Sequence, residues 1–376
     1  MADILRFADK LGPAKIIQVH EPTIDLKAVL VIDNIAMGPA AGGIRMAPDV
    51  SIEECVRLAR TMTLKNAAVG MSHGGAKTVV YADPKMPKPE KERLIRALAC
   101  ALRNFPEYIM GPDMGTDEEC MAWIKDELNN HNVTGLPAEA GGIPIDQIGA
   151  AAWGLRHALE VALPYCRCPV GFNLNGARVA IQGFGAVGMN TARFLAEQKA
   201  VLVGAADSQG SVYDSGGLDV NKLIKLKEAG KSVVDYPEGE KFDRDAIVGF
   251  DCDIWIPAAR PDVVREDNVD RLKAKLVVEG ANIPITEGAE KYLHEKGVLC
   301  VPDFIANSGS IICADMEYRG KIESEALDVI QKKVRSNTRL ILEESRINNI
   351  TPREAAINLA VTRLEKAMSY KRWSIY

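Results

Sequence analysis

Three residues in the first third of the chain, Lys65, Lys77 and Asp113, have the types and the surroundings of an acid–base site. One lysine ammonium can pair with the carboxylate of a substrate. A second lysine, partly desolvated beside a like charge, has a lowered pKa and can act as a general base. Asp113 follows Gly111-Pro112 on an expected loop, where its carboxylate can carry the proton. The three residues therefore predict proton-transfer chemistry on a substrate that carries a carboxylate.

Lys65 is expected on a helix that begins after Ser51. Ser51 followed by Glu54 predicts a capping box, and the apolar residues Leu58 and Met62 recur at helical spacing. Lys65 continues this stripe, so we expect it on the core-facing side, where its charge needs compensation. The alternative is that the lysine stem covers apolar surface while the ammonium reaches water.

Lys77 follows three small residues, Gly74-Gly75-Ala76, and is expected to open a strand over residues 78–82. Small residues let a backbone and a ligand approach each other closely. The upstream segment 38–45, GPAAGGIR, is by itself typical of a flexible turn. Its place ahead of the Lys65 helix also suits it to hold a small ligand.

The composition narrows the class of protein. The chain has 376 residues, 47% hydrophobic and 26% charged, which indicates a globular protein of about two domains. Its net charge of -5 and the lack of a long basic run argue against nucleic acid or an anionic membrane as the main partner. The chain has no apolar run of about 18 residues, so the sequence predicts no membrane span. The N-terminus also lacks the apolar core of a signal peptide. We therefore expect a cytoplasmic protein.

Eight cysteines are scattered along the chain, which predicts reduced thiols. Cys166 and Cys168 are close in sequence, but no second cysteine or histidine pair stands at zinc-like spacing. We therefore expect no metal site.

Residues 178–207 have the order of a dinucleotide fingerprint. Residues 178–182 predict a short apolar strand, and Gly183-Phe184-Gly185-Ala186-Val187-Gly188 follows it directly. We expect a helix over 189–198, a second strand over 200–206, and then Asp207. The glycines allow a pyrophosphate to approach the helix N-terminus, and the acid accepts the ribose hydroxyls.

Three further apolar strands, over 252–257, 276–279 and 298–301, alternate with helical stretches and predict a parallel sheet. Ala259 and Asn282 follow two of these strands, where ligands bind in open α/β sheets. Simple turn chemistry is the alternative for both loops.

We expect an α/β fold of two domains with a cleft between them. Residues 1–147 form the substrate-binding and catalytic domain, and residues 148–340 form a doubly wound Rossmann domain. The helices of residues 341–376 pack back on the first domain. The other elements expected in or beside the first domain are strands around residues 16–17 and 28–32, helices over 90–104 and 117–128, and a connector helix over 148–163.

With these motifs the chain resembles the glutamate/leucine/phenylalanine/valine dehydrogenase family over nearly its full length. The resemblance is carried, in this order, by GPAAGGIRMAPDVS, TMTLKNAA, GGAK, GPDMGT, VAIQGFGAVG, VVEGANIPIT and PDFIANSGS. It implies a reversible, nicotinamide-dependent oxidative deamination of an L-amino acid to a 2-oxo acid and ammonia. It also implies a homo-oligomer, since the family forms hexamers or octamers.

By the same resemblance, Lys77 is the catalytic lysine, Lys65 holds the substrate α-carboxylate and Asp113 transfers protons. The other positions implied for the substrate are Ala41, Gly42, Gly43 and Ala314. The positions implied for the cofactor are Gly183, Phe184, Gly185, Ala186, Val187, Gly188, Asp207, Ala259 and Asn282.

Two departures from the family favour an apolar substrate side chain. Glutamate-specific members carry a lysine at the position of Ala41 and a serine at that of Ala314, so an acidic side chain would be desolvated without a partner. The runs TMTLKNAA and GGAKTV are also similar to those of leucine-type members. A glutamate dehydrogenase that uses another basic anchor, such as the nearby Arg45, is the alternative.

Three further positions leave alternatives open. His73 stands where the family has an apolar or aromatic residue, either as a polar group of the substrate site or as a structural histidine. Ala151 replaces the family threonine that bonds the nicotinamide, and this loss suggests a non-catalytic regulator as the alternative. Asp207 repels a 2′-phosphate, which favours NAD as the cofactor, although Ser208 leaves room for NADP.

Overall fold

The structure of the protein is a computed structural model, which describes residues 4–129, 132–169 and 171–373. The chain folds into two compact units, each built from separate stretches of sequence. The first unit contains the described residues up to Pro144, those of Ile311–Ala326 and those from Ile357 onward. The second unit contains the described residues of Ile145–Ser310 and Leu327–Ala356.

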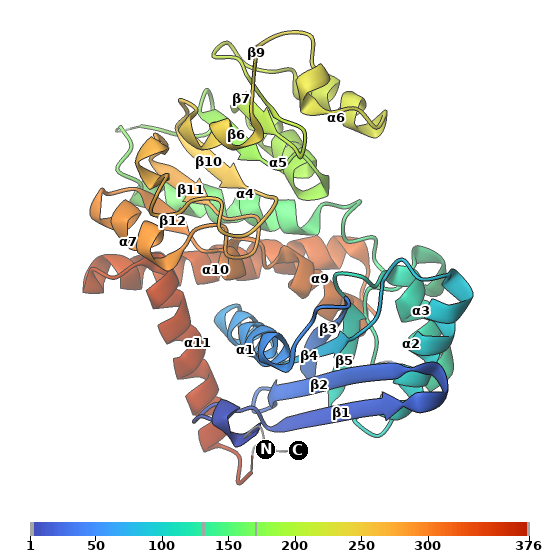
Figure 1. The fold of residues 1–376 in the computed structure, drawn as a ribbon. Coiled ribbons are helices and arrows are strands. Elements are labelled where there is room, and N and C mark those ends of the chain that lie inside the picture. The colour runs from blue at the N-terminus through green and yellow to red at the C-terminus, as the bar shows by residue number, and fades with distance from the viewer. Residues whose placement is uncertain (1–3, 130–131, 170, 374–376) are drawn as a thin grey trace. The chain divides into compact units, whose positions relative to one another are not determined.

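A five-stranded mixed sheet forms the centre of the first unit, in the order β1-β2-β4-β3-β5 (Figure 1). Its strands are β1 Lys15–Glu21, β2 Leu26–Asn34, β3 Ala40–Met46, β4 Gly74–Val80 and β5 Tyr108–Pro112. β2 is antiparallel to β1 and to β4, whereas β3 runs parallel to both β4 and β5. The strands expected around residues 16–17 and 28–32 are confirmed as β1 and β2.

Helices cover both faces of this sheet, because alternate residues of its strands are apolar on both sides. α2 (Lys88–Leu102) and α3 (Glu118–Leu128) cover one face, in a core that includes Leu30 of β2. α1 (Ile52–Ala68) packs on the other face, in a core that includes Val31. All three helices were expected from the sequence, with ends within a few residues of those observed.

The glycine-rich segment, expected as a flexible turn, is strand β3. A Cβ atom on Gly42 would lie 1.7 Å from the carbonyl oxygen of Ala76 on the neighbouring strand. Glycine is therefore required by the close approach of two backbones, and not by a turn. β4 also begins at Gly74, so Lys77 lies within the strand and does not open it.

The expected face of α1 is also wrong. Lys65 is half-buried on the flank of the helix, together with Leu58 and Met62. The residues of α1 that are buried are Cys55, Ala59, Thr63, Asn66, Ala67 and Ala68. Small side chains face the sheet because the helix lies very close to it: a Cβ atom on Gly75 would be 2.1 Å from the backbone nitrogen of Thr63. The larger apolar residues therefore mark the edge of the contact.

A seven-stranded sheet forms the centre of the second unit, in the order β12-β11-β10-β6-β7-β8-β9 (Figure 1). Its strands are β6 Arg178–Gln182, β7 Val201–Ala206, β8 Ser211–Tyr213, β9 Glu240–Phe242, β10 Ile254–Pro257, β11 Leu276–Val278 and β12 Leu299–Val301. The strands from β12 to β7 are parallel, as expected. The antiparallel strands β8 and β9 were not expected from the sequence.

Helices complete the described chain. Those not yet introduced are α4 Ala150–Ala162, α5 Ala186–Glu197, α6 Val220–Glu228, α7 Glu287–Glu295, α8 Asp303–Ala306, α9 Gly309–Tyr318, α10 Glu323–Asn348 and α11 Pro352–Ser369. The 3-10 helices are η1 Ile4–Phe7, η2 Pro22–Ile24, η3 Ala138–Ala140, η4 Leu163–Tyr165, η5 Val233–Asp235, η6 Arg244–Gly249 and η7 Val269–Arg271. Within the described ranges, no helix is both long and apolar enough to cross a membrane.

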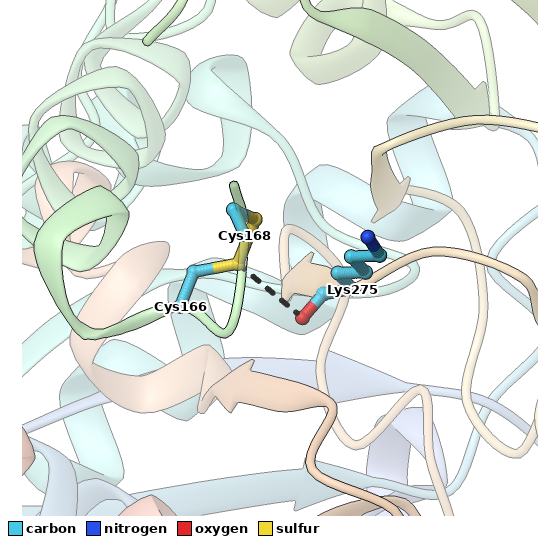
Figure 2. The surroundings of a disulfide bond; sticks show 3 residues. All are labelled: Cys166, Cys168 and Lys275. Carbon is cyan, nitrogen blue, oxygen red and sulfur yellow. Dashed lines mark hydrogen bonds between the residues drawn. A yellow bond between two sulfur atoms is a disulfide. The ribbon is translucent and has the colours of Figure 1, made fainter. Parts of the chain in front are cut away.

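Cys166 and Cys168 form a disulfide, which Figure 2 shows. The chain bends directly after η4, so the two Cα atoms are 5.2 Å apart, a separation that a disulfide spans. Cys166 Sγ also lies 3.8 Å from the carbonyl oxygen of Lys275 (Figure 2). The expectation of reduced thiols is therefore wrong for this pair, whereas Cys55, Cys100, Cys120, Cys252, Cys300 and Cys313 are free.

Candidate active site

Strand β3 brings Lys77 and Asp113 together in the first unit. Ile44 of β3 pairs with Thr78 of β4 on one side and with Pro112 of β5 on the other. Lys77 precedes Thr78 and Asp113 follows Pro112, so both residues flank the same short segment of β3. The ammonium of Lys77 donates a hydrogen bond to the carboxylate of Asp113. The sheet register therefore assembles the pair that the sequence predicts.

Glycine at position 43 leaves room for this pair. A Cβ atom on Gly43 would lie 2.9 Å from the Cβ of Asp113 and 2.7 Å from the carbonyl oxygen of Pro112. A larger residue would therefore displace the strand end that carries Asp113. The absence of a side chain at Gly43 therefore allows Asp113 to keep its position.

Arg45 completes the charge pattern around Asp113. Its Nη2 lies 3.4 Å from Asp113 Oδ1, and its Nη1 lies 2.5 Å from Glu54 Oε1. Glu54 therefore pairs with Arg45, and the capping box expected at Ser51 is reduced to one bond, which the Ser51 hydroxyl accepts from the Glu54 amide at 3.1 Å. The guanidinium of Arg45 is therefore already paired with the carboxylates of Asp113 and Glu54.

Lys77 has the protonation behaviour of a base that works near neutral pH. Its residue is 6% exposed, and burial lowers its pKa from 10.5 to about 7, with further contributions from the charges of Arg45 and Lys65. A pKa near neutrality leaves a large fraction of the amine uncharged at physiological pH. Lys65 lies close enough to contribute to this shift, as expected for two ammonium groups at one site.

The other predicted substrate positions lie in the same unit. Ala41 is half-buried on β3, opposite Gly75, and Gly42 is buried beside it. Ala314 is half-buried on α9. The structure thus retains small side chains at both positions where glutamate-specific members carry a polar one.

The imidazole of His73 contacts the buried carboxyl group of Asp315, the residue that follows Ala314. His73 Nε2 lies 2.6 Å from Asp315 Oδ1, and His73 Nδ1 lies 3.3 Å from the carbonyl oxygen of Pro39. Arg319 Nε donates to the same carboxylate at 2.8 Å. Both ring nitrogens of His73 therefore have protein partners.

The second unit holds the predicted dinucleotide loop. Gly183 has a φ of +95°, and a Cβ atom there would lie 2.5 Å from the Cβ of Ala259, which places Ala259 against the loop. A Cβ on Gly188 would lie 2.0 Å from the carbonyl oxygen of Gly183, so glycine allows α5 to pack on the loop. Phe184 is fully buried, so its side chain belongs to the core and only its backbone borders the loop.

The N-terminus of α5 suits a pyrophosphate. Gly185 is the N-cap residue of α5, which begins at Ala186, and as a glycine it has no side chain to bond the first amides of the helix. The space beside it is open, because a Cβ atom built on Gly185 would have no neighbour within 4 Å. The first amides of the helix, from Ala186 to Gly188, are therefore donors suited to an anion. The residues present fit the dinucleotide that the fold implies.

A pocket of about 330 Å³ lies beside this loop, entirely within the second unit. Its lining includes the glycine loop, Asp207 and Ser208 at the end of β7, and Ala259 after β10. Asn282, which follows β11, accepts a hydrogen bond from Asn307 Nδ2 at 3.1 Å. Ala151 is buried on α4, and no group of three or more metal-binding side chains occurs among the described residues.

Asp207 differs from the open carboxylate expected for a ribose acceptor. Lys227 Nζ and the Val233 amide donate to Oδ2 at 2.6 and 2.9 Å, while Ser232 Oγ and the Gln209 amide donate to Oδ1 at 2.8 and 3.0 Å. A carboxylate has about four acceptor positions, and all are used here. Burial opposes ionisation, but these bonds outweigh it and lower the pKa of Asp207.

Arg353, at the start of α11, joins three buried carboxylates of the second unit. Its Nη2 lies 2.6 Å from Glu279 Oε2, its Nε 2.5 Å from Glu290 Oε2 and its Nη1 2.9 Å from Asp303 Oδ1. Asp303 Oδ2 in turn accepts the amide of Ile283 at 3.1 Å. Glu279 and Ile283 lie on either side of the loop that contains Asn282. Arg353 therefore holds both ends of this loop, directly through Glu279 and through Asp303 at Ile283. Its signal in the sequence, Thr351-Pro352-Arg353-Glu354, indicated only the start of a helix.

A parallel sheet with a glycine loop at its carboxyl edge, and a lysine–aspartate pair in a separate unit, define a nicotinamide-dependent dehydrogenase. Family models agree with this class: residues 13–130 match the Glu/Leu/Phe/Val dehydrogenase dimerisation domain, and residues 141–372 match Glutamate/Leucine/Phenylalanine/Valine dehydrogenase. The chain belongs to this family and is an NAD(P)-dependent amino acid dehydrogenase.

Individual relatives refine the comparison. The chain is 36% identical to a glutamate dehydrogenase of Aeropyrum pernix over 90% of its own length and 85% of that protein. It is 34% identical to an NADP-specific glutamate dehydrogenase of Saccharolobus shibatae (89% and 82% covered) and 34% identical to an NAD-specific one of Staphylococcus aureus (91% and 85% covered). These relatives are glutamate dehydrogenases, so they do not support the expected closeness to leucine-type members.

A solved structure agrees in fold. The hetero-hexameric glutamate dehydrogenase from Thermus thermophilus, in a leucine-bound form, has a TM-score of 0.83 and 29% sequence identity to this chain, covering 96% of this chain and 91% of that one. The two-domain α/β fold expected from the sequence is thereby confirmed.

Proposed function

We propose that the protein catalyses the reversible oxidative deamination of an L-amino acid to a 2-oxo acid and ammonia, with the first unit binding the amino acid and the second the dinucleotide. The buried pair of Lys77 and Asp113 carries this proposal. A lysine whose pKa is about 7 is an effective general base at neutral pH. A protein that only binds nucleotides does not need a general base, so this lysine favours an enzyme.

The residues act in sequence on the substrate. Lys65 pairs with the α-carboxylate and orients the α-carbon. A bound nicotinamide would supply the acceptor for the hydride of that carbon, which leaves an iminium. Lys77 takes a proton from water as the water oxygen attacks the iminium carbon and forms a carbinolamine. Asp113 relays this proton to the nitrogen, the C–N bond breaks to release ammonia, and the hydroxyl proton passes to Asp113 as the C=O bond forms. Arg45 stabilises the carboxylate of Asp113 between these transfers.

L-Glutamate is the substrate that we propose first. The relatives described above are glutamate dehydrogenases at 34–36% identity. His73 directly precedes β4, the strand that carries Lys77. A substrate side chain that extends from Lys77 toward this end of the strand would approach the imidazole of His73. This imidazole, which would exchange its 3.3 Å contact with the Pro39 carbonyl for the substrate, is the anchor that we propose for a side-chain carboxylate in place of Arg45.

An apolar amino acid is the second candidate, and one observation favours it. Ala41 and Ala314 are half-buried methyl groups at the positions where glutamate-specific members carry a lysine and a serine. If the side chain of the substrate meets only these two groups, burial of an acidic side chain is unfavourable. The two candidates differ in whether the substrate reaches His73.

A panel of 2-oxo acids decides between the candidates. Reductive amination is measured with ammonia and either NADH or NADPH, using 2-oxoglutarate, 2-oxo-4-methylpentanoate and phenylpyruvate. Preference for 2-oxoglutarate supports glutamate, and preference for either of the others supports an apolar substrate. No turnover with any acid would overturn the enzymatic proposal in favour of a regulator that only binds ligands.

We also propose that the protein is a homo-oligomer. The first unit contains residues that match a domain described as a dimerisation domain, and the structure from Thermus thermophilus is described as a hetero-hexamer. Sedimentation equilibrium of the purified protein measures the subunit number directly, and a monomer at micromolar concentration would contradict this proposal.

A further inference from the structure

The pocket beside the glycine loop is more positively charged than the sequence alone indicated. Lys227 on α6, Arg244 on η6 and Arg260 after β10 all line it, together with Asp207 and Ser208. Three cations from three separate elements therefore converge on the end of β7. In doubly wound folds this strand end faces the ribose of the adenosine half of a dinucleotide.

Asp207 does not offset this charge as a free carboxylate would. Its side chain is 9% exposed, and Lys227 Nζ holds it at 2.6 Å. With Ser232, Val233 and Gln209 also donating to it, the carboxylate has no acceptor position left for a ribose hydroxyl. Lys227 offsets its charge, so its repulsion of a second phosphate is weak.

The two arginines retain positive charge on the open side of the pocket. Asp245 pairs with both: its Oδ1 lies 3.0 Å from Arg244 Nε and 2.9 Å from Arg260 Nη2. One carboxylate therefore serves two guanidinium groups. The side chains of Arg244 and Arg260 remain 39% and 44% exposed, which leaves donors of both groups free to turn toward a ligand.

The net charge of the pocket is positive. Lys227, Arg244 and Arg260 supply three positive charges, against two negative charges from Asp207 and Asp245. The exposed Ser208 adds a hydroxyl donor next to the ribose position. A site of net positive charge with a guanidinium fork and a hydroxyl suits a phosphate monoester.

We propose that this pocket binds the 2′-phosphate of NADP, with Arg244, Arg260 and Ser208 as its phosphate-binding residues and Lys227 as the residue that neutralises Asp207. The proposal rests on the proposed function for the role of the dinucleotide, and it reverses the preference for NAD that Asp207 suggests from sequence. Relatives use either cofactor: one is NADP-specific and another NAD-specific.

Binding of two adenosine nucleotides tests the proposal without catalysis. Adenosine 2′,5′-bisphosphate and adenosine 5′-monophosphate differ only in the 2′-phosphate, so the ratio of their dissociation constants by titration calorimetry reports that group. At low salt we expect the full-length protein to bind the bisphosphate at least tenfold more tightly. The ratio should shrink as salt rises, because salt screens the additional phosphate.

Three variants assign the effect to residues. Arg244→Gln should reduce the preference for the bisphosphate at least fivefold, and Ser208→Asp, which places a free carboxylate in the pocket, should abolish or invert it. Arg265→Gln is the matched control, because Arg265 is an exposed arginine of the same unit, 47% exposed and paired with Asp267. It should leave the ratio within twofold of that of the unchanged protein.

Two results would overturn the proposal: equal or tighter binding of the monophosphate by the unchanged protein, or an equal loss of both ligands in Arg244→Gln. Arg244→Gln and Ser208→Asp should also shift kcat/KM from NADPH toward NADH in the 2-oxo acid assay, whereas Arg265→Gln should not. A protein that keeps its preference for the bisphosphate but turns over no 2-oxo acid would refute the proposed function and leave the phosphate site standing.

Discussion

Lys77 and Asp113 are 36 residues apart in sequence and form an ion pair across the strand that separates them. The pair brings one ammonium against one carboxylate in a buried position, with Arg45 on the far side of the carboxylate. The pair holds the lysine in one place, whereas burial lowers its pKa to about 7. This pair is also the point at which the proposed reaction is most easily broken.

Replacement of Lys77 by alanine should lower kcat by a factor of about 10² to 10⁴, the usual contribution of a positioned acid–base group. Steady-state amination of the preferred 2-oxo acid measures this loss. Binding of adenosine 2′,5′-bisphosphate, which involves the second unit, should stay within twofold. An unchanged kcat would remove Lys77 from the mechanism.

The pH profile should follow the pKa of Lys77, which is lowered to about 7. The amine is the required base, so it is active when uncharged. Oxidative deamination should therefore be maximal above pH 7 and should fall about tenfold per pH unit below it. The measurement is kcat/KM for the amino acid in buffers of constant ionic strength. A midpoint close to 10.5, the value for an exposed lysine, would contradict the burial of this group.

Gly43→Ala should impair catalysis through Asp113. The added methyl group would lie 2.9 Å from the Cβ of Asp113 and 2.7 Å from the carbonyl oxygen of Pro112, so the end of β5 must shift. We expect kcat to fall at least tenfold and stability to fall by about 1–3 kcal/mol. Gly216→Ala is the matched control, because its nearest neighbour is a side-chain oxygen of Asp214 at 3.3 Å. Comparable kcat values in the two variants would show that Gly43 is not needed for the geometry of the site.

His73→Leu should separate the two substrate candidates. If the imidazole of His73 anchors a side-chain carboxylate, KM for 2-oxoglutarate should rise at least tenfold, while KM for 2-oxo-4-methylpentanoate should change little. The control is His20→Leu, which alters an exposed histidine on β1 of the same unit. Equal effects of His73→Leu on both acids would indicate a structural histidine that does not contact the substrate.

Arg353→Met should destabilise the protein by about 3–5 kcal/mol, because it leaves buried carboxylates without their cation. Burial raises the pKa of Glu279 and Glu290, so both can take up protons once Arg353 is gone. The loss should therefore shrink as pH falls toward about 5. Urea unfolding at two pH values measures it, with the exposed Arg265→Met as a control whose effect should stay below about 1 kcal/mol. Equal losses in both variants would contradict the role of Arg353 as a buried hub.

Local sequence determined the chemistry and the elements that carry it. The glycine loop from Gly183 to Gly188, the strand before it and the helix after it follow from patterns that span about 30 residues. The types of Lys77 and Asp113 also fixed their possible roles, because few side chains can move protons near neutral pH. Errors at this level were local: β3 was taken for a turn, since glycines that permit close strand contact look the same in sequence as glycines that permit a turn.

The tertiary structure decided which partner each side chain meets. His73 and Asp315 are 242 residues apart, and Arg353 reaches carboxylates from three other segments. The sequence predicts Asp207 as an open acceptor for ribose, but the donors around it in the structure already occupy and neutralise its carboxylate. Such pairings depend on how distant segments pack, and local periodicity has no information about them. The sequence by itself thus determined which reactions are available, and packing alone decided the charge, and hence the selectivity, of the sites that perform them.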